Sequence, residues 1–460
     1  MRKRASLVLT CLALAAVITS LSLTGKTAHA TGVTTYTGVI DGAAYLVQIP
    51  DNWNGTLVLY SHGFRETPGA PNPAEDAPDA GSQGYLLAQG YALAGSSYSS
   101  GDGWVVELAL HDDFALLDYF DAHFANGHLT RTVAWGNSLG GMITAGLVQR
   151  EPDRFAGALP MCGVLAGGVG TWNTALDGAF AFKTLLAPNS PIQLTNITDP
   201  ATNFGIAKAT LEAAQNTPQG RARIALGAAL ADIPGWFDPS SAEPASTDYV
   251  AQEFNQFLYD DRIDFAFAFF WRANVEQRAG GNPSWNTGVN YNKLLSQSID
   301  YQEVQALYAQ AGLNLDQDLA TLQSAPRIAA NASAVQYLSD NISYNGQISI
   351  PVLTMHTTAD GLVVSQDERA YSSVVRAEGN NALLREVFVH RANHCTFTPA
   401  ENITAFQTLI QRVDTGKWGD STDPALMNQE ASGLGSPFNV LPPAFTQFTP
   451  TLFLRPYTVN

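Results

Sequence analysis

The segment RTVAWGNSLGGMITAGLVQR, residues 131–150, restricts the fold of this chain more than any other stretch. It reads as an apolar strand, a glycine-rich turn and a helix, in that order. Its centre, GNSLG at residues 136–140, fits the pattern G-x-S-x-G, which places a serine at a sharp strand-to-helix corner. The flanking glycines leave room for strand and helix to cross closely. We therefore expect the Ser138 hydroxyl to stand clear of a sheet, as a nucleophile must.

Strand patterns alternate with helical patterns on both sides of this corner. Residues 35–62 read as three strands, and the alternation runs on to the apolar strand FAGALPMCG at residues 155–163. It resumes with ISIPVLTMHTTAD at residues 348–360 and ALLREVFVH at residues 382–390. Such alternation predicts a mostly parallel sheet with helices on both faces, which is an α/β fold.

Between these two regions the alternation stops. Residues 163–347 show helical patterns and hold no histidine or cysteine, so we expect a mainly helical cap inserted between core residues 31–162 and 348–413. Residues 414–460 read as an extended, proline-rich tail. The aromatic run FAFAFFW, residues 265–271, is typical of the buried core of a helical subdomain, but it also fits the apolar wall of a ligand pocket.

The first 30 residues have the pattern of a secretory signal peptide. A positive cluster at residues 2–4 precedes an apolar stretch at residues 5–23, and Ala28-His29-Ala30 fits a cleavage site. An uncleaved membrane anchor is the alternative. No later stretch is long and apolar enough to span a bilayer. We expect a secreted, extracellular protein with no membrane association after cleavage.

The net charge restricts the classes of binding partner, and the cysteine content bears on whether the chain forms a disulfide. Loss of the four positive charges of residues 1–30 moves the formal net charge from −17 to −21. So acidic a surface argues against nucleic acid and anionic lipid as partners. Cys162 and Cys395 are the cysteines that remain, and in an oxidising compartment they suit a single disulfide, although each could be a free buried residue.

A serine nucleophile needs a base, and the base needs an orienting acid. Asp360 ends a predicted strand, and the carboxyl ends of strands lie beside the site in open α/β sheets. Asp367 is the competitor, but it falls in the first turn of a predicted helix, where acids commonly interact with the helix dipole. We therefore expect Asp360 to be the acid.

The base should follow in HRANHCTFTPAE, residues 390–401. His390 closes an apolar strand, and His394 falls in a loop before a helix that starts near Thr398. The two histidines therefore do not share a helix face, and we expect no metal site. His394 is the predicted base, with His390 as the fallback, which gives the chain order Ser138, Asp360, His394.

The reaction intermediate also needs donors for its oxyanion. We expect one from the backbone N–H of Leu139, directly after the nucleophile, and another from Phe64 in the turn SHGF at residues 61–64. His62 in that turn is expected to brace the loop and to take no part in proton transfer.

The segments SHGF, GNSLGG, TTAD and NHC resemble those of secreted serine hydrolases of the α/β-hydrolase superfamily, over about residues 35–162 and 346–413. The resemblance implies an eight-stranded sheet with the cap inserted after the sixth strand. It also implies an acyl-enzyme mechanism without a cofactor.

The pair His394-Cys395 is additionally similar to the tannase and fungal-type feruloyl esterase group, in which cysteines beside the catalytic serine and histidine are bridged. Asn137 precedes the serine here, so Cys162 is the partner that remains for Cys395. A Cys162–Cys395 disulfide would pin the histidine loop to the sheet. Because of Asn137, we do not adopt the tannase-like assignment.

The sequence supports a carboxylic-ester hydrolase that acts on a small-molecule or polymeric ester, with an apolar or aromatic group suggested by the cap. The alternative is a serine exopeptidase of aminopeptidase type, which would need a cap carboxylate to hold a substrate amine. Asp260, Asp261 and Asp264 lie beside the aromatic run. A non-catalytic binding protein is disfavoured by the order of the three site residues.

Overall fold

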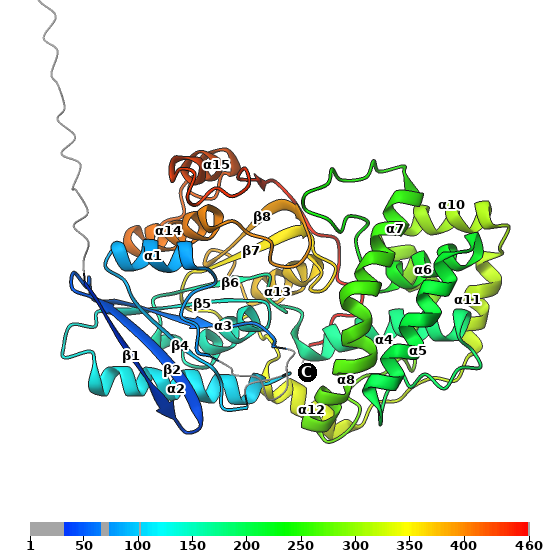
Figure 1. Ribbon diagram of the computed structural model, residues 1–460, viewed down its shortest axis with the longest axis horizontal. Helices are drawn as coiled ribbons and strands as arrows, with labels where there is room; N and C mark the ends of the chain where they lie inside the picture. Colours follow the sequence, from blue (N-terminus) through cyan, green and yellow to red (C-terminus); the bar gives the residue numbers. More distant parts are fainter. Residues whose placement is uncertain (1–31, 66–72, 101–102, 459–460) are drawn as a thin grey trace, which may run out of the picture.

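The computed structural model describes residues 32–65, 73–100 and 103–458. The predicted signal peptide, residues 1–30, lies outside the described residues. Figure 1 shows a twisted sheet with helices above and below it, and a group of helices packed beside it as a separate lobe.

The sheet is mostly parallel, and its nine strands in the described chain follow the order β1-β2-β4-β3-β5-β6-β7-β8-β9. Antiparallel pairing is confined to the two edges, in the pairs β1–β2, β2–β4 and β8–β9. The strands are β1 (Val33–Ile40), β2 (Ala43–Pro50), β3 (Thr56–Ser61), β4 (Ala92–Ser96), β5 (Arg131–Asn137), β6 (Gly157–Met161), β7 (Val352–Ala359), β8 (Leu384–Ala392) and β9 (Phe445–Thr446).

The implied number of eight strands is wrong by one. The ninth strand, β9, comes from the C-terminal tail and pairs with Phe388 and Val389 of β8. A sheet edge presents unpaired backbone groups, and this two-residue strand covers part of them. So short a pairing leaves no period in the sequence by which it could be predicted.

The central strands are buried on both faces. Leu57 and Leu59 of β3 pack with one set of helices, whereas Val58 and Tyr60 pack with the other, because successive side chains of a strand point to opposite faces. The first set is α2 (Val106–His123), α3 (Leu139–Arg150) and α13 (Gln366–Ala377), and the second is α1 (Ala80–Ala88) and α14 (Pro399–Thr415). A short 3₁₀ helix, Pro152–Arg154, precedes β6.

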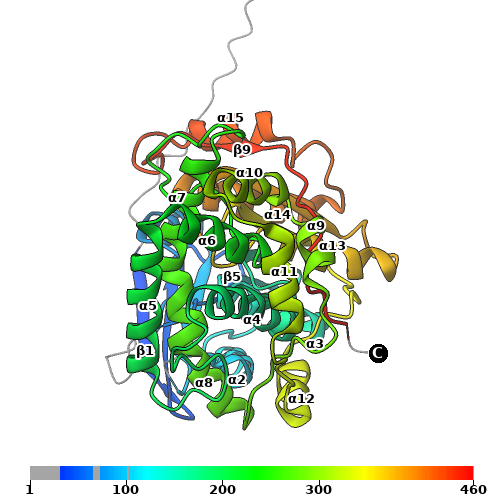
Figure 2. The same ribbon diagram turned by 90° about the vertical axis from the view of Figure 1, so that its right-hand side faces the viewer.

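The predicted helical cap lies between β6 and β7 and has its own apolar core (Figure 2). Two π-helical segments, η2 (Asp260–Asp264) and η3 (Phe267–Trp271), interrupt one long helix. This helix begins with α7 (Tyr249–Tyr259) and ends with α8 (Arg272–Ala279). The cap elements are α4 (Gly167–Leu186), α5 (Pro200–Gln215), α6 (Pro218–Leu230), α7 (Tyr249–Tyr259), η2 (Asp260–Asp264), η3 (Phe267–Trp271), α8 (Arg272–Ala279), α9 (Tyr291–Gln297), α10 (Tyr301–Ala311), α11 (Leu315–Ser324) and α12 (Ala332–Asn341). The chain thus has the α/β-hydrolase fold with a helical insertion after the sixth strand, as predicted.

Residues 414–460 are not extended throughout, contrary to the prediction. They include α15 (Pro424–Gly433), which begins at the N-cap Asp423, whose carboxylate accepts hydrogen bonds from two backbone N–H groups of the first turn. Pro424 at the first helical position favours the same start. The last residues then run between the sheet and the cap, where Leu454 joins the cap core (Figure 1).

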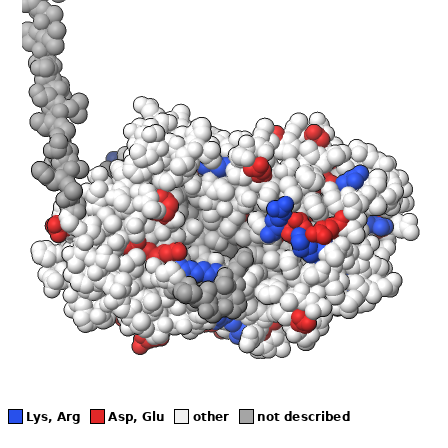
Figure 3. All heavy atoms as spheres, in the orientation of Figure 1, with Lys and Arg blue, Asp and Glu red and all other residues white. Residues whose placement is uncertain are grey.

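Charged side chains are sparse on the face seen in Figure 3. Lys and Arg residues lie beside Asp and Glu residues over the cap, and they form no continuous basic patch on this face. None of the helices in the described ranges is long and apolar enough to cross a bilayer.

Candidate active site

The serine corner has the geometry that its glycines suggest. Ser138 lies between β5 and α3 with φ 58° and ψ −128°, a conformation that side-chain-bearing residues seldom adopt. A Cβ atom added to Gly140 would lie 1.9 Å from the carbonyl oxygen of Ser61, and one added to Gly136 would lie 2.5 Å from that of Gly140. Both positions therefore require glycine for the strand and helix to cross here.

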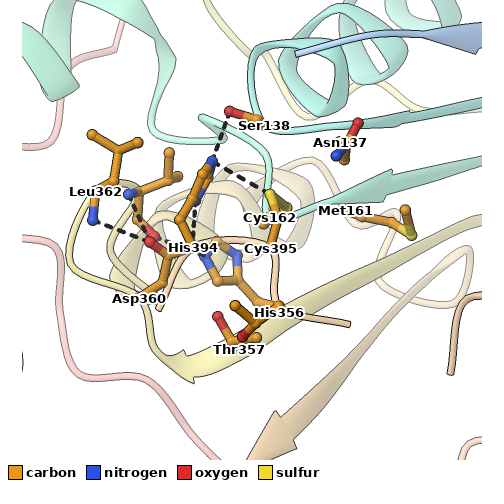
Figure 4. Close-up of a disulfide and its surroundings, with 12 residues drawn as sticks. Asn137, Ser138, Met161, Cys162, His356, Thr357, Asp360, Leu362, His394 and Cys395 are labelled. Carbon is orange, nitrogen blue, oxygen red and sulfur yellow. Dashed lines mark hydrogen bonds and ion pairs between the residues drawn. A yellow bond between two sulfur atoms is a disulfide. The ribbon is translucent and has the colours of Figure 1, made fainter. Parts of the chain in front are cut away.

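Three side chains from separate strand ends form one hydrogen-bonded row (Figure 4). The Ser138 hydroxyl donates to His394 Nε2 at 2.7 Å, and His394 Nδ1–H donates to Asp360 Oδ2 at 2.7 Å. Asp360 directly follows β7 and His394 follows β8, so the sheet brings the predicted nucleophile, acid and base together.

The row has the geometry of a serine hydrolase on a sheet with the α/β-hydrolase fold. No family model matches it. It is 28% identical over 428 residues to o-phthalyl amidase from Xanthobacter agilis, across 86% of this chain and 91% of that protein.

Two of the similar solved structures are esterases. An esterase from Aspergillus oryzae is 14% identical and superimposes with a TM-score of 0.43, over 84% of this chain and 80% of that one. Feruloyl esterase B from the same organism is 15% identical with a TM-score of 0.41, over 84% and 81%.

The two competing residues, Asp367 and His390, do not reach the serine. Asp367 accepts a hydrogen bond from the backbone N–H of Ala166. His390 is half exposed, and its ring lies beside Thr358 and Glu243. Neither side chain contacts the row, so the geometry selects Asp360 and His394 from the alternatives that the sequence left open.

A second histidine, His356 on β7, lies beneath the acid and was missed by sequence reasoning. Its Nδ1 is 3.0 Å from Glu368 Oε1, and its Nε2 is 2.8 Å from the carbonyl oxygen of Val363. Because a carbonyl and a carboxylate both accept, each ring nitrogen must carry a proton, and the buried His356 is an imidazolium. The only sequence signal was a histidine inside an otherwise buried strand, four residues before Asp360.

This cation acts on the acid at close range. His356 Nε2 lies 3.6 Å from Asp360 Oδ2. Burial would lower the pKa of His356, but the negative charges of Asp360 and Glu368 and the hydrogen bond to Glu368 raise that pKa to about 10. Burial alone would raise the pKa of Asp360, but the hydrogen bond from His394 and the charges of His394 and His356 hold it well below its usual range. Asp360 is therefore ionised throughout the neutral range.

The two predicted oxyanion donors border the same cavity as the serine. Leu139 opens α3, where the first N–H groups have no partner within the helix. Phe64 follows Gly63, which packs so closely on the corner that an added Cβ would lie 3.2 Å from Ser138 Cβ. The role of these amides in binding an oxyanion stays a prediction.

His62 occupies a buried position behind this loop. Its Nδ1–H donates to the carbonyl oxygen of Gly63 at 2.7 Å, and its ring stacks on Tyr98 with centroids 4.0 Å apart. Burial and the nearby Arg65 lower the pKa of His62 to about 4, so the ring is neutral. These contacts agree with the bracing role expected from the sequence.

The Cys162–Cys395 disulfide is present, as predicted. It joins the residue after β6 to the residue after His394, so the histidine loop is bonded to the sheet (Figure 4). Among the described residues, the one set of potential metal ligands within reach of each other is this pair with His394, and both sulfurs are bonded to each other. Asn137 accepts a hydrogen bond from the Tyr60 hydroxyl and takes no part in the bridge.

The serine opens onto a cavity of about 1070 Å³, counted to its open mouth, between sheet and cap. Its walls are mainly apolar, with large contributions from Phe64, Trp104, Trp172, Phe182, Phe265 and Phe267. The aromatic run, residues 265–271, was expected to be either the core of the cap or the wall of a pocket, and it is partly both. Phe265 and Phe267 line the cavity, whereas Phe269 packs within the cap core. Phe453 of the tail also lines the cavity, a contribution that the sequence did not indicate.

Proposed function

We propose that this protein is a secreted carboxylic-ester hydrolase whose substrate, a small molecule or a polymer chain, carries an apolar or aromatic group. One observation chiefly supports the proposal: the hydrogen-bonded row of Ser138, His394 and Asp360 opens onto a cavity with aromatic walls. An apolar cavity with a few placed polar groups is the usual form of a small-molecule site.

The reaction begins when Ser138 Oγ attacks the ester carbonyl and His394 Nε2 takes the hydroxyl proton. Asp360 stabilises the resulting imidazolium. The backbone N–H groups of Leu139 and Phe64 hold the oxyanion, a contribution of roughly 3–4 kcal/mol for one such donor. His394 then returns the proton to the leaving alcohol as the carbon–oxygen bond breaks, which leaves the acyl group on Ser138.

Hydrolysis of the acyl-enzyme repeats these steps with water. His394 takes a proton from the water molecule, the hydroxide attacks the acyl carbonyl, and the bond to Ser138 Oγ breaks. Ser138 regains the proton from His394, and the carboxylic acid leaves. The cycle needs no redox step and no group beyond the protein and water.

Amide hydrolysis is the second candidate, and the 28% identity to o-phthalyl amidase favours it. The same row of residues serves both reactions, because the proton from His394 is delivered equally well to a leaving amine. An exopeptidase is one form of this candidate, and it would need a carboxylate for the substrate amine.

The test compares wild type with Ser138→Ala on nitrophenyl esters and nitroanilides of the same acids, graded from acetyl to phenylpropionyl. We expect ester turnover to fall by about 10⁴-fold or more in Ser138→Ala. Anilide turnover comparable with ester turnover would make the protein an amidase. If Ser138→Ala retains full ester turnover, the proposed function is wrong.

We also propose export, supported by the charge and hydropathy pattern of residues 1–30. The mature protein from an expressing culture should begin at Thr31. N-terminal sequencing of protein from the medium checks this, and intact protein that begins at Met1 in the membrane fraction would overturn it.

A further inference from the structure

The cap contributes two carboxyl groups to the wall of the catalytic cavity. Asp260 and Asp264 stand at the two ends of the π-helical segment η2, and both line the cavity onto which Ser138 opens. π-Helical turns are rare and frequently occur at functional sites. Asp260 and Asp264 are four residues apart, so their side chains lie on the same side of the helix, and both border the cavity.

This segment is fixed directly over the catalytic loops. Tyr259, the residue before η2, has its hydroxyl oxygen 2.7 Å from the carbonyl oxygen of Ala359, and it accepts the backbone N–H of Asn393 at 2.9 Å. A Cβ atom on Gly361 would lie 2.5 Å from the Tyr259 ring. The residues before and after Asp360, and the residue before His394, therefore hold η2 in place.

Within the described residues, neither carboxyl group pairs with a Lys or Arg side chain. Asp260 is 8% exposed, and its carboxyl group makes no hydrogen bond or ion pair within the described ranges. Oδ2 of Asp264 is buried and has no hydrogen-bond partner there either. Asp261, between them, differs: it pairs with Lys208 and with Arg262.

Arg223 is the one Lys or Arg among the described residues that line the cavity, and it is already paired with Asp318. Arg223 donates to Asp318 through Nε at 2.7 Å and through a terminal nitrogen at 3.2 Å. Burial raises the pKa values of Asp260 and Asp264 well above the usual range, and neighbouring acids, Asp360 among them for Asp264, raise them further. Buried carboxyl groups without a partner are costly, and they are stabilised by a bound group that carries N–H donors and positive charge.

The rest of the cavity wall is aromatic, and this restricts the kind of substrate that can carry the positively charged group. Phe265 and Phe267 follow the two acids along the chain and line the same cavity. Phe64 and Trp172 also line it, and both rings pack against Phe267. Aromatic faces attract a cation and also pack against an apolar stem. The wall therefore suits an aromatic or aliphatic group that ends in a cationic nitrogen.

We propose that Asp260 and Asp264 bind a cationic nitrogen of the substrate, so that the site prefers ammonium-bearing esters or amides over uncharged or anionic ones of the same shape. This inference rests on the proposed function, and it names the substrate class of that site. It also gives the exopeptidase alternative the cap carboxylates that it requires.

The experiment uses the nitrophenyl esters of 4-(aminomethyl)benzoic and 4-ethylbenzoic acid, which match in shape, and the larger ester of 4-(carboxymethyl)benzoic acid. In the wild type, kcat/KM for the ammonium ester should exceed that for the ethyl ester by about tenfold or more, and the carboxylate ester should be the poorest. In Asp260→Asn/Asp264→Asn the ammonium-to-ethyl ratio should fall to about one. Asp261→Asn is the matched control and should keep the wild-type ratio, because Asp261 is paired outside the cavity.

The proposal is overturned if the wild type shows no ammonium preference, or if the double variant keeps it. A calorimetric titration separates this result from a failure of the proposed function. Benzylammonium should bind to Ser138→Ala at least tenfold more tightly than to Ser138→Ala/Asp260→Asn/Asp264→Asn, whether or not any ester is hydrolysed. Equal binding of benzylammonium by the two variants, or binding by neither, contradicts the inference. If the wild type hydrolyses none of the esters but the two variants differ in binding as expected, only the proposed function is contradicted.

Discussion

At the scale of single residues, Asp360 lies between two histidines with different hydrogen-bond partners. His394 donates to it through Nδ1, and its Nε2 accepts the hydrogen bond of the Ser138 hydroxyl. His356 has acceptors on both ring nitrogens and is positively charged. A buried cation 3.6 Å from the carboxylate keeps the acid ionised without competing for the proton that is transferred.

Replacement of His356 by glutamine removes this charge while a hydrogen-bonding side chain remains. The pKa of Asp360 should then rise toward its ordinary value, because one of the two groups that lower it is gone. A carboxyl with a raised pKa is protonated as the pH falls, so the ratio of variant to wild-type kcat should decrease from pH 7 to pH 4. We expect a shift of the acidic limb by about one pH unit.

The matched control is His390→Gln, which changes a half-exposed histidine outside the row. Its kcat should follow the wild-type pH profile. A constant ratio for His356→Gln across this pH range would contradict the account, because a purely structural loss lowers kcat equally at every pH.

Ser138, Asp360 and His394 could be predicted from the sequence because each follows a recognisable strand in the order that the fold requires. His356 could not, because its charge depends on Glu368 and on a carbonyl oxygen that only the folded chain places beside it. The cavity position of Asp260 depends on how the cap packs on the catalytic core, which the pattern of a single helix does not fix.

At the scale of elements, the disulfide joins the ends of β6 and β8 beside the base. Its two cysteines are 233 residues apart, with the whole cap between them. Ser138, Cys162, Asn393 and Cys395 all have positive φ, so the corner and the histidine loop are both held in conformations that residues with side chains seldom adopt. Such conformations persist only where the surroundings hold them.

Replacement of both cysteines by serine should therefore affect stability and turnover together. We expect the free energy of unfolding to fall by about 2–4 kcal/mol. We also expect kcat to fall more than KM rises, because the His394 loop loses its bond to the sheet while the cavity wall remains. Denaturant unfolding and steady-state kinetics check both effects, and reduction of the wild type should reproduce them. A double variant as stable and as active as the wild type would show that the disulfide neither stabilises the fold nor positions the His394 loop.

The insertion of the cap could be predicted because the strand alternation stops after β6 and resumes at β7. The π-helical segments could not, since FAFAFFW has an apolar pattern that suits a plain helix equally well. The prolines of the tail predict an extended chain and hide α15, although Asp423-Pro424 is a good signal for a helix N-terminus.

At the scale of the whole molecule, the cap buries acids in a chain that is already strongly negative. Burial raises the pKa of Glu253 to about 8, of Asp300 to about 7 and of Glu303 to about 9. A group whose pKa is raised in the folded state stabilises that state fully below its unfolded pKa, and loses this contribution as the pH rises through the folded value. The raised pKa values of Glu253, Asp300 and Glu303 therefore all lower the stability of the folded state as the pH rises from about 5 to about 9.

The midpoint of thermal unfolding should therefore be highest near pH 5 and should fall steadily toward pH 9. His356, whose pKa is raised to about 10, adds to the same trend. Scanning calorimetry from pH 5 to pH 9 measures it. In Glu303→Gln, which keeps the shape of the protonated acid, the decline between pH 7 and pH 9 should be shallower. A midpoint that rises with pH over this range would contradict the account.

The measurement that tests the central claim most directly is the intact mass of the protein after reaction with a fluorophosphonate, followed by peptide mapping. We predict one adduct per chain on Ser138 in the wild type, none on that peptide in Ser138→Ala, and much slower labelling in His394→Ala, because the serine then lacks its base. An adduct on another residue, or undiminished labelling of Ser138→Ala, would show that the row of Ser138, His394 and Asp360 is not the reacting site.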